Sequence, residues 1–246
     1  MDYKRWYKKF NDYAKNFDLK KKWIMYKYHH TYRVVEYAKK IAISLKLKEE
    51  DFDLAILSSL LHDIARFEQW TKYETYVDAK SFDHGDQGYK ILKENNYINE
   101  YIESKEKQDI VLYAVKNHNK KNIDDSINDS KYQLIANIVR DADKLDIMME
   151  LCNFIKDDSS KLNDIIVEKI NNRELCDNKY IKNDVDGILR ALGFIFDLNC
   201  KYSFEFILKN KIIENKIQLL EIYTNDERLE EIKNNLINYA KEKIKC

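Results

Sequence analysis

The absence of proline and the scarcity of glycine constrain this chain more than any other feature. Its 246 residues include no proline and only four glycines, whereas average usage would give roughly 12 and 17. Folds built from strands rely on glycine and proline for their many tight turns. A chain that lacks them is better suited to helices joined by Asn, Asp and Ser turns, so we expect an all-α protein.

Apolar residues recur at helical spacing along most of the chain. His30, Val34, Ala38 and Ile41 share one face of a helix predicted over residues 28–47. Residues 54–61 are apolar on nearly every face, which is typical of a buried helix, predicted here from about residue 51 to 68. Other helices are predicted over residues 3–17, 84–93, 110–117 and 132–154, the last interrupted at residues 140–146, with polar connections at 69–83 and 120–130.

No change in composition marks a domain boundary. We therefore predict a single all-α domain over residues 1–246. Residues 25–150 would carry the functional motifs, and residues 151–246 would add C-terminal helices whose role the sequence does not indicate.

The charge balance restricts the classes of partner. Lys plus Arg equals Asp plus Glu, at 43 each. The chain therefore has no net positive charge that would attract nucleic acid or an anionic membrane. No stretch of about 18 residues, the length that spans a bilayer, lacks charge. We expect a small-molecule partner at a local site, no nucleic-acid polymer and no membrane. The oligomeric state cannot be predicted.

The cysteines indicate a reducing compartment. Cys152, Cys176, Cys200 and Cys246 are far apart and form no C-x-x-C pair, so we interpret them as free thiols. The N-terminal residues have no apolar core of the kind that a signal peptide needs. A cytoplasmic protein is expected.

The segment L-L-H-D-I-A-R-F-E, residues 60–68, places His62 and Asp63 in the predicted buried helix. Burying an ionised carboxylate is costly unless it is paired or bound to a metal. Of five histidines, three more (His30, His84 and His118) lie on apolar helix faces or at their starts. One such histidine is usually a core residue, but four beside a buried aspartate indicate a metal site, and this ligand chemistry suits Zn, Mn, Fe and Co.

Five segments, taken in order, resemble the HD-domain superfamily of metal-dependent phosphohydrolases. They are H-T-Y-R-V at 30–34, L-L-H-D-I-A-R-F at 60–67, D-H-G-D-Q-G at 83–88, V-K-N-H-N-K at 115–120 and R-D-A-D-K-L-D at 140–146. The resemblance covers about residues 25–150. It implies a helical HD-domain-like bundle that hydrolyses a phosphate ester of a small metabolite or nucleotide.

The resemblance also implies a set of metal ligands. A first ion would be held by His30, His62, Asp63 and Asp143, and a second by His84 and His118, with Asp63 bridging the two. One or two divalent ions per chain are therefore expected (Mn, Fe, Mg, Zn, Co or Ni), and no organic cofactor. Such ions could activate a water for in-line attack on phosphorus.

Two ligand assignments have competitors. His29 lies about 100° from the apolar stripe that contains His30, and we interpret it as a surface residue. Asp141 and Asp143 are about 200° apart on a helix, so both cannot face one ion. Periodicity does not choose between them, but the A-D-[K/R]-L pattern of the family selects Asp143. Asp141 is then either a carboxylate that orients a histidine or a solvated charge.

Two basic residues are candidates for binding a substrate phosphate, beside Asp63 as the bridging catalytic group. Arg66 follows Asp63 by three residues and shares its helix face; it could clamp a phosphate or form a salt bridge to Glu36 or another carboxylate. Lys144 follows the predicted ligand Asp143 and could do the same, or be a surface lysine.

Two other functions compete with phosphohydrolysis. The ligand set of four histidines and two aspartates also resembles that of the di-iron oxygenases on this fold, such as inositol oxygenase, and fold alone does not set function. A non-catalytic module that uses the metal site to bind a regulatory ligand is the third possibility. The sequence names no substrate.

Overall fold

A computed structural model describes residues 2–124, 127–150 and 161–245. These residues form α-helices and short 3-10 turns, with no strand among them, so the predicted all-α class is confirmed. The α-helices are α1 (Tyr3–Ala14), α2 (Lys22–Ser44), α3 (Glu49–Leu61), α4 (Ala65–Tyr73), α5 (His84–Lys93), α6 (Lys105–Asn117), α7 (Ser130–Glu150), α8 (Asp164–Asn171), α9 (Asp184–Leu192), α10 (Lys201–Lys209), α11 (Ile212–Tyr223) and α12 (Arg228–Lys245).

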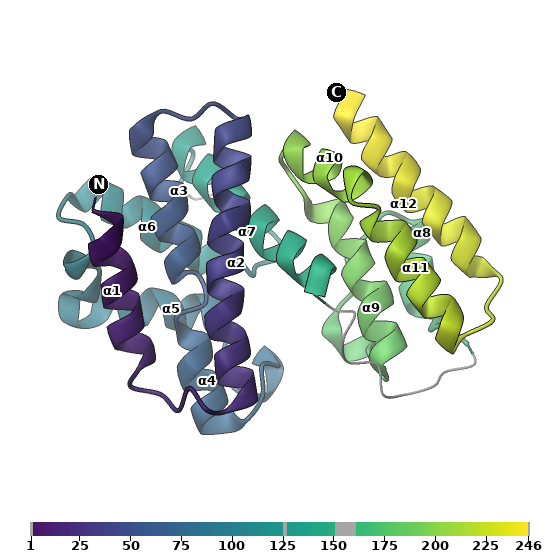
Figure 1. The fold of residues 1–246 in the computed structure, drawn as a ribbon, viewed down its shortest axis with the longest axis horizontal. Coiled ribbons are helices and arrows are strands. Elements are labelled where there is room, and N and C mark those ends of the chain that lie inside the picture. The colour runs from purple at the N-terminus through teal and green to yellow at the C-terminus, as the bar shows by residue number, and fades with distance from the viewer. Residues whose placement is uncertain (1, 125–126, 151–160, 246) are drawn as a thin grey trace. The chain divides into compact units, whose positions relative to one another are not determined.

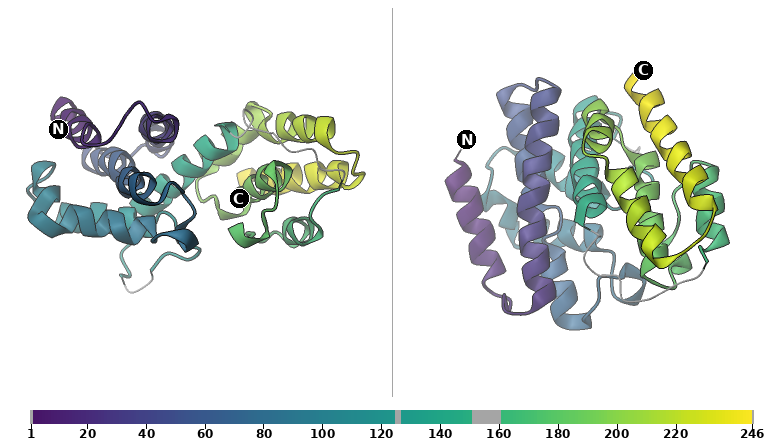
Figure 2. Two further views of the ribbon diagram at one scale, coloured as in Figure 1. Left: turned by 90° about the horizontal axis from the view of Figure 1, so that it is seen from below. Right: turned by 45° about the vertical axis from the view of Figure 1, so that its right-hand side comes forward.

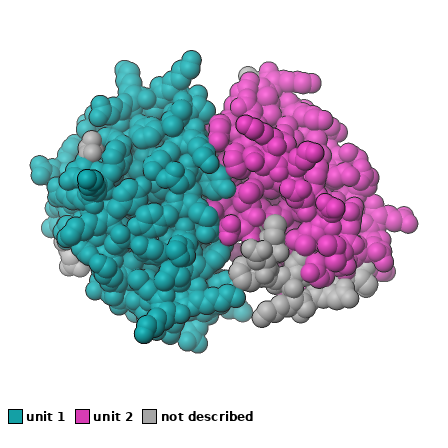
Figure 3. Space-filling view, viewed as in Figure 1, with its two compact units in different colours: residues 1–143 teal, residues 144–246 magenta. Residues whose placement is uncertain are grey.

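The chain divides into two compact units, residues 1–143 and 144–246 (Figure 3). In the first unit α2 packs against α3 and α4, and α6 packs against α3 and α5 (Figure 1). In the second unit α12 packs against α8, α10 and α11 (Figure 2). The division falls within α7, near the end of the segment predicted to carry the motifs. That both units form a single domain stays a prediction.

The helix predicted over residues 51–68 is two helices, and this correction bears on the site. α3 ends at Leu61 and α4 begins at Ala65, so His62 and Asp63 lie in the turn between them. The turn is tight, because the N–H of Ile64 donates to the carbonyl of Leu61 at 3.1 Å. A segment buried on every face gives no periodic signal where such a helix ends. α4 then extends to Tyr73, so the polar connection predicted at 69–83 starts later than expected.

Other boundaries also differ from the prediction. α7 passes through residues 140–146 without a break, so the predicted interruption is wrong: Asp141 and Asp146 are buried inside the helix rather than ending it. α2 starts at Lys22 and α6 at Lys105, both earlier than predicted, whereas α5 covers the predicted residues 84–93. Residues 151–154 of the predicted long helix lie outside the described residues.

Asp and Asn side chains cap the starts of four helices. The side chains of Asp2, Asp83, Asn163 and Asn183 each accept a backbone N–H at the start of a helix. At the end of α4, Glu74 takes the left-handed conformation that glycine usually supplies, with φ of 50°.

One glycine is needed where α5 meets α6. A Cβ atom at Gly85 would lie 2.7 Å from the carbonyl oxygen of Lys116, closer than such atoms approach. The neighbouring residue in α5 is His84, and His118 immediately follows α6. The bare backbone of Gly85 therefore lets these two histidines come together.

Within the described residues, no helix combines the length and the apolar character that a membrane crossing requires. Cys176 and Cys200 form no disulfide, in agreement with the prediction, and both are buried. Cys152 and Cys246 lie outside the described residues.

Candidate metal centre

Four of the five histidines are buried, and they converge in the first unit. The most exposed of the four is His84, at 5%, whereas His29 is exposed, in agreement with its interpretation as a surface residue. His30 comes from the middle of α2, His62 from the turn after α3, His84 from the start of α5 and His118 from the end of α6. Four separate elements thus bring imidazoles to one place.

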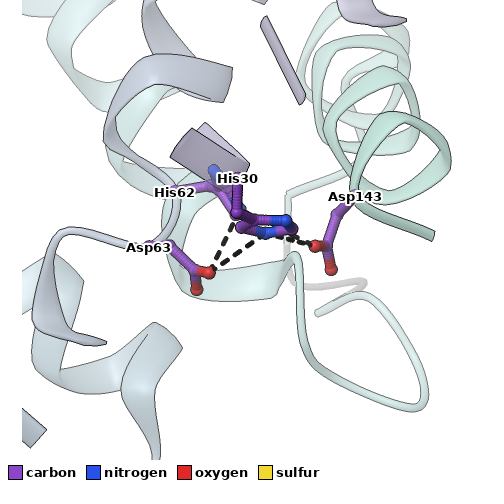
Figure 4. Close-up of side chains that lie close together, drawn as sticks. All are labelled: His30, His62, Asp63 and Asp143. Carbon is purple, nitrogen blue, oxygen red and sulfur yellow. Dashed lines mark ion pairs between the residues drawn. The ribbon is translucent and has the colours of Figure 1, made fainter. Parts of the chain in front are cut away.

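The first ligand cluster consists of His30, His62, Asp63 and Asp143. One donor atom from each lies within 4.8 Å of the others. The Nε2 atom of His30 is 3.3 Å from Oδ2 of Asp63 and 3.1 Å from Oδ1 of Asp143. Figure 4 shows the two imidazoles between the two carboxylates. The arrangement offers two nitrogen and two oxygen donors to one ion.

The second ligand cluster consists of Asp63, His84 and His118. Oδ1 of Asp63 lies 3.6 Å from Nε2 of His84 and 3.5 Å from Nε2 of His118. The other oxygen, Oδ2, faces the first cluster. Asp63 therefore directs one oxygen to each cluster, as a carboxylate that bridges two ions must.

Hydrogen bonds fix the tautomer of three of these histidines. Nδ1 of His62 lies 2.7 Å from the carbonyl oxygen of Ser59, and Nδ1 of His118 lies 2.7 Å from that of Val115. A carbonyl can only accept, so each Nδ1 carries the proton, and a neutral ring then has its lone pair on Nε2. In His84, Nδ1 lies 2.6 Å from Oδ2 of Asp78, which assigns the same tautomer.

These tautomers show that the residues present fit metal ions. The Nε2 atoms of His84 and His118 are 3.0 Å apart, and two lone pairs at that distance repel unless a cation lies between them. Nε2 of His62 is buried without a hydrogen-bond partner among the described residues, which is a cost that a bound ion would remove. Imidazole and carboxylate donors together suit Mn, Fe, Zn and Co.

In the second ligand cluster the pKa shifts favour the protonation states that metal binding requires, whereas in the first ligand cluster burial acts to lower the pKa of His62 but Asp63 and Asp143 outweigh it and raise this pKa. Burial lowers the pKa of His84 to about 3, and the charge of Arg66 adds to this effect; burial also lowers the pKa of His118. Burial acts to raise the pKa of Asp63, but Lys27 and His62 outweigh it and hold this pKa well below its usual range. The second cluster is thus neutral imidazole beside ionised carboxylate.

The structure distinguishes the two aspartates of the R-D-A-D-K-L-D segment. Asp143 belongs to the first ligand cluster, as the family pattern implied. Asp141 is fully buried, so its interpretation as a solvated charge is wrong.

The two predicted phosphate-binding residues are both held by carboxylates. Nη1 of Arg66 lies 3.0 Å from Oδ1 of Asp78, and Nε lies 3.4 Å from Oδ1 of Asp63, so Arg66 forms the predicted salt bridge to a carboxylate, with Asp78 and Asp63 in the place of Glu36. Lys144 is buried, with Nζ 2.9 Å from Oδ2 of Asp197. Lys144 is therefore no surface lysine. Phosphate binding by either residue stays a prediction.

Asp78 is a residue of the site that the sequence analysis missed. Besides His84 and Arg66, its carboxylate accepts from Nε2 of Gln69 at 3.0 Å and Nδ2 of Asn119 at 3.3 Å. The pKa of Asp78 is lowered, since the hydrogen bond from His84 and the nearby charges outweigh its burial. Asp78 lies in a connection with several acidic residues, and spacing alone does not show which of them reaches a histidine.

Replacing Asp78 with asparagine should weaken the second metal site selectively. The amide carries no charge, so it orients His84 less firmly and makes its ring a poorer donor. We expect metal affinity at one of two binding steps to fall about 10- to 100-fold. Calorimetric titration with Mn²⁺ would measure both steps, with exposed Asp109→Asn as the matched control. An equal loss of metal affinity at both binding steps, or no loss at either step, would contradict the role of Asp78 in supporting His84.

Comparison with known families agrees with the geometry. The family model of the HD domain matches residues 28–148, close to the predicted extent of 25–150. That segment contains every member of the two ligand clusters. Comparisons with curated proteins and with solved structures found no significant match. Through residues 28–148, the chain belongs to the HD-domain superfamily.

Proposed function

We propose that this protein is a metal-dependent phosphohydrolase that cleaves a phosphate ester of a small metabolite or nucleotide. The observation that carries the proposal is the division of the two Asp63 oxygens between the ligand clusters, because it suits two ions held close together. Membership of the HD-domain superfamily supports the general reaction class.

The first ligand cluster would hold one divalent ion and the second ligand cluster another. Such ions lower the pKa of water and neutralise charge on phosphate oxygens. The chain itself orients the donors: the carbonyls of Ser59 and Val115 hold His62 and His118 through Nδ1, and Asp78 holds His84. Donors fixed in this way need little reorganisation during the reaction.

The reaction is hydrolysis at phosphorus. A water oxygen forms a bond to phosphorus as the bond from phosphorus to the ester oxygen breaks, and a proton from the water ends on the departing alcohol. Because the ligand residues are buried, bulk water is largely excluded and charge interactions at the phosphate are strengthened.

The test is phosphate release by metal-loaded protein from a panel of nucleotides, sugar phosphates and diesters. We expect turnover of at least one compound, lost on chelation and absent from the Asp63→Asn variant. Absence of turnover across the panel with Mn²⁺, Fe²⁺ and Zn²⁺ would contradict the proposal. Oxygen consumption by the iron-loaded protein would instead support the di-iron oxygenase.

We also propose that the protein acts in the cytoplasm on a small soluble substrate. Buried cysteines outside disulfides, such as Cys176 and Cys200, are typical of a reducing compartment. The equal number of acidic and basic residues gives no general attraction to nucleic-acid polymers or anionic membranes.

A further inference from the structure

Lys27 brings a buried ammonium to the metal centre. It lies on α2, one helical turn before His30, and is only 8% exposed. Its Nζ is 2.6 Å from Oδ2 of Asp63, and it lies 5.6 Å from the ring centroid of Tyr76. A buried cation is retained only where an anion or other strong partner compensates it.

The partners of Lys27 differ in kind from those of Arg66. Nη1 of Arg66 donates to the carbonyl of Tyr76 at 2.8 Å and to Asp78, so it anchors the connection after α4. Lys27 has one carboxylate partner among the described residues, and that partner is the Asp63 oxygen that faces the first ligand cluster. Metal binding to this oxygen would reduce its attraction for the ammonium of Lys27. The ammonium would then be available to bind an additional anion.

The charges at the site indicate which anion that is. The described residues place three carboxylates there (Asp63, Asp78 and Asp143) and two cations (Lys27 and Arg66). With neutral imidazoles they sum to one negative charge, and two divalent ions would change the sum to three positive charges. A hydroxide and a phosphate-monoester dianion together carry three negative charges, whereas a hydroxide and a diester carry two. Uncompensated charge is costly in a buried site.

We propose that Lys27 is a catalytic residue that binds the phosphoryl oxygens of the substrate and selects phosphate monoesters over diesters. The inference rests on the proposed function, which it deepens. Without Lys27 the loaded site would carry two positive charges, matched by a hydroxide and a diester. Removing the ammonium should therefore weaken monoester binding and also lower the preference for monoesters over diesters.

The first experiment measures binding and does not depend on turnover. Metal-loaded wild type, Lys27→Met and Lys27→Gln are titrated calorimetrically with inorganic phosphate and with dimethyl phosphate, after metal content is measured. We expect both variants to keep two metals and to bind phosphate about 10- to 100-fold more weakly, as for loss of a charge-assisted hydrogen bond. Dimethyl phosphate should be affected less. Exposed Lys40 lies on the same helix, and Lys40→Met should match wild type.

Loss of metal in both Lys27 variants would overturn the inference, since Lys27 would then support the ligands rather than the substrate. Unchanged phosphate affinity, or equal weakening for the two anions, would overturn it as well.

The second experiment compares kcat/KM for p-nitrophenyl phosphate and bis(p-nitrophenyl) phosphate. Wild type should favour the monoester, and the ratio should fall at least about 10-fold in Lys27→Met. If wild type hydrolyses the monoester and the ratio does not change, the inference about Lys27 fails while the proposed function stands. If wild type neither binds phosphate nor hydrolyses an ester, both fail.

Discussion

The Asp63→Asn variant is expected to bind neither metal ion firmly and to lose more than about 10³-fold in kcat/KM. This exceeds the 10- to 100-fold loss that is usual for a residue that only supports a ligand. Both carboxylate oxygens are used, Oδ2 toward His30 at 3.3 Å and Oδ1 toward His118 at 3.5 Å. The amide of asparagine has the same shape as the carboxylate but lacks its charge. The amide nitrogen carries hydrogens and cannot replace the second carboxylate oxygen as a metal ligand. One substitution therefore damages both ligand clusters.

The effect of Asp63→Asn is measured as metal per chain by mass spectrometry, together with kcat/KM on the best substrate found. Asp109→Asn makes the same chemical change at an exposed position and should retain wild-type metal content. Circular dichroism of both variants would exclude unfolding as the cause. Two firmly bound metals in Asp63→Asn would show that this carboxylate does not bridge.

The Arg140→Met variant should lose about 3 kcal/mol of unfolding free energy. Arg140 is 2% exposed, and its Nη1 donates to the carbonyls of Asn117 at 2.9 Å and Lys120 at 2.5 Å. These carbonyls flank His118 at the end of α6, where a helix leaves its last carbonyls unsatisfied. Methionine fills much of the space but donates no hydrogen bond, so buried acceptors lose a charged donor. The second ligand cluster should also bind metal more weakly, because His118 loses its support.

Denaturant unfolding of the metal-free proteins measures this loss without a contribution from bound ions. Arg5 is exposed, and Arg5→Met should stay within about 0.5 kcal/mol of wild type. A change in Arg140→Met as small as in this control would show that Arg140 does not hold the end of α6.

The sequence predicts what depends on local periodicity. Apolar spacing identifies the face of α2 that carries His30, and the apolar residues before His62 correctly indicate a buried segment. The order of the five motifs implies the six ligand residues, and the structure brings donor atoms of all six into two clusters that share Asp63. Whether these clusters bind metal stays a prediction.

The sequence does not predict what depends on contacts between distant residues. Asp78 reaches His84 because Arg66 and Gln69 hold its connection against α4, and no spacing rule encodes that loop path. The break between α3 and α4 was missed because the residues around it are buried on all sides. The burial of Lys27 beside His30 could have been predicted from the sequence, because Lys27 precedes His30 by three residues and so shares the buried face of α2.

The most direct test of a pair of metal ions bridged by Asp63 is the metal content of the wild-type chain. The protein would be purified anaerobically, and metals would be quantified per chain by mass spectrometry before and after reconstitution. We predict two ions per chain. The identity of the metal distinguishes a phosphohydrolase from a di-iron oxygenase only when it is combined with the activity assays. A saturating content of one ion, or of none, would contradict the bridged centre.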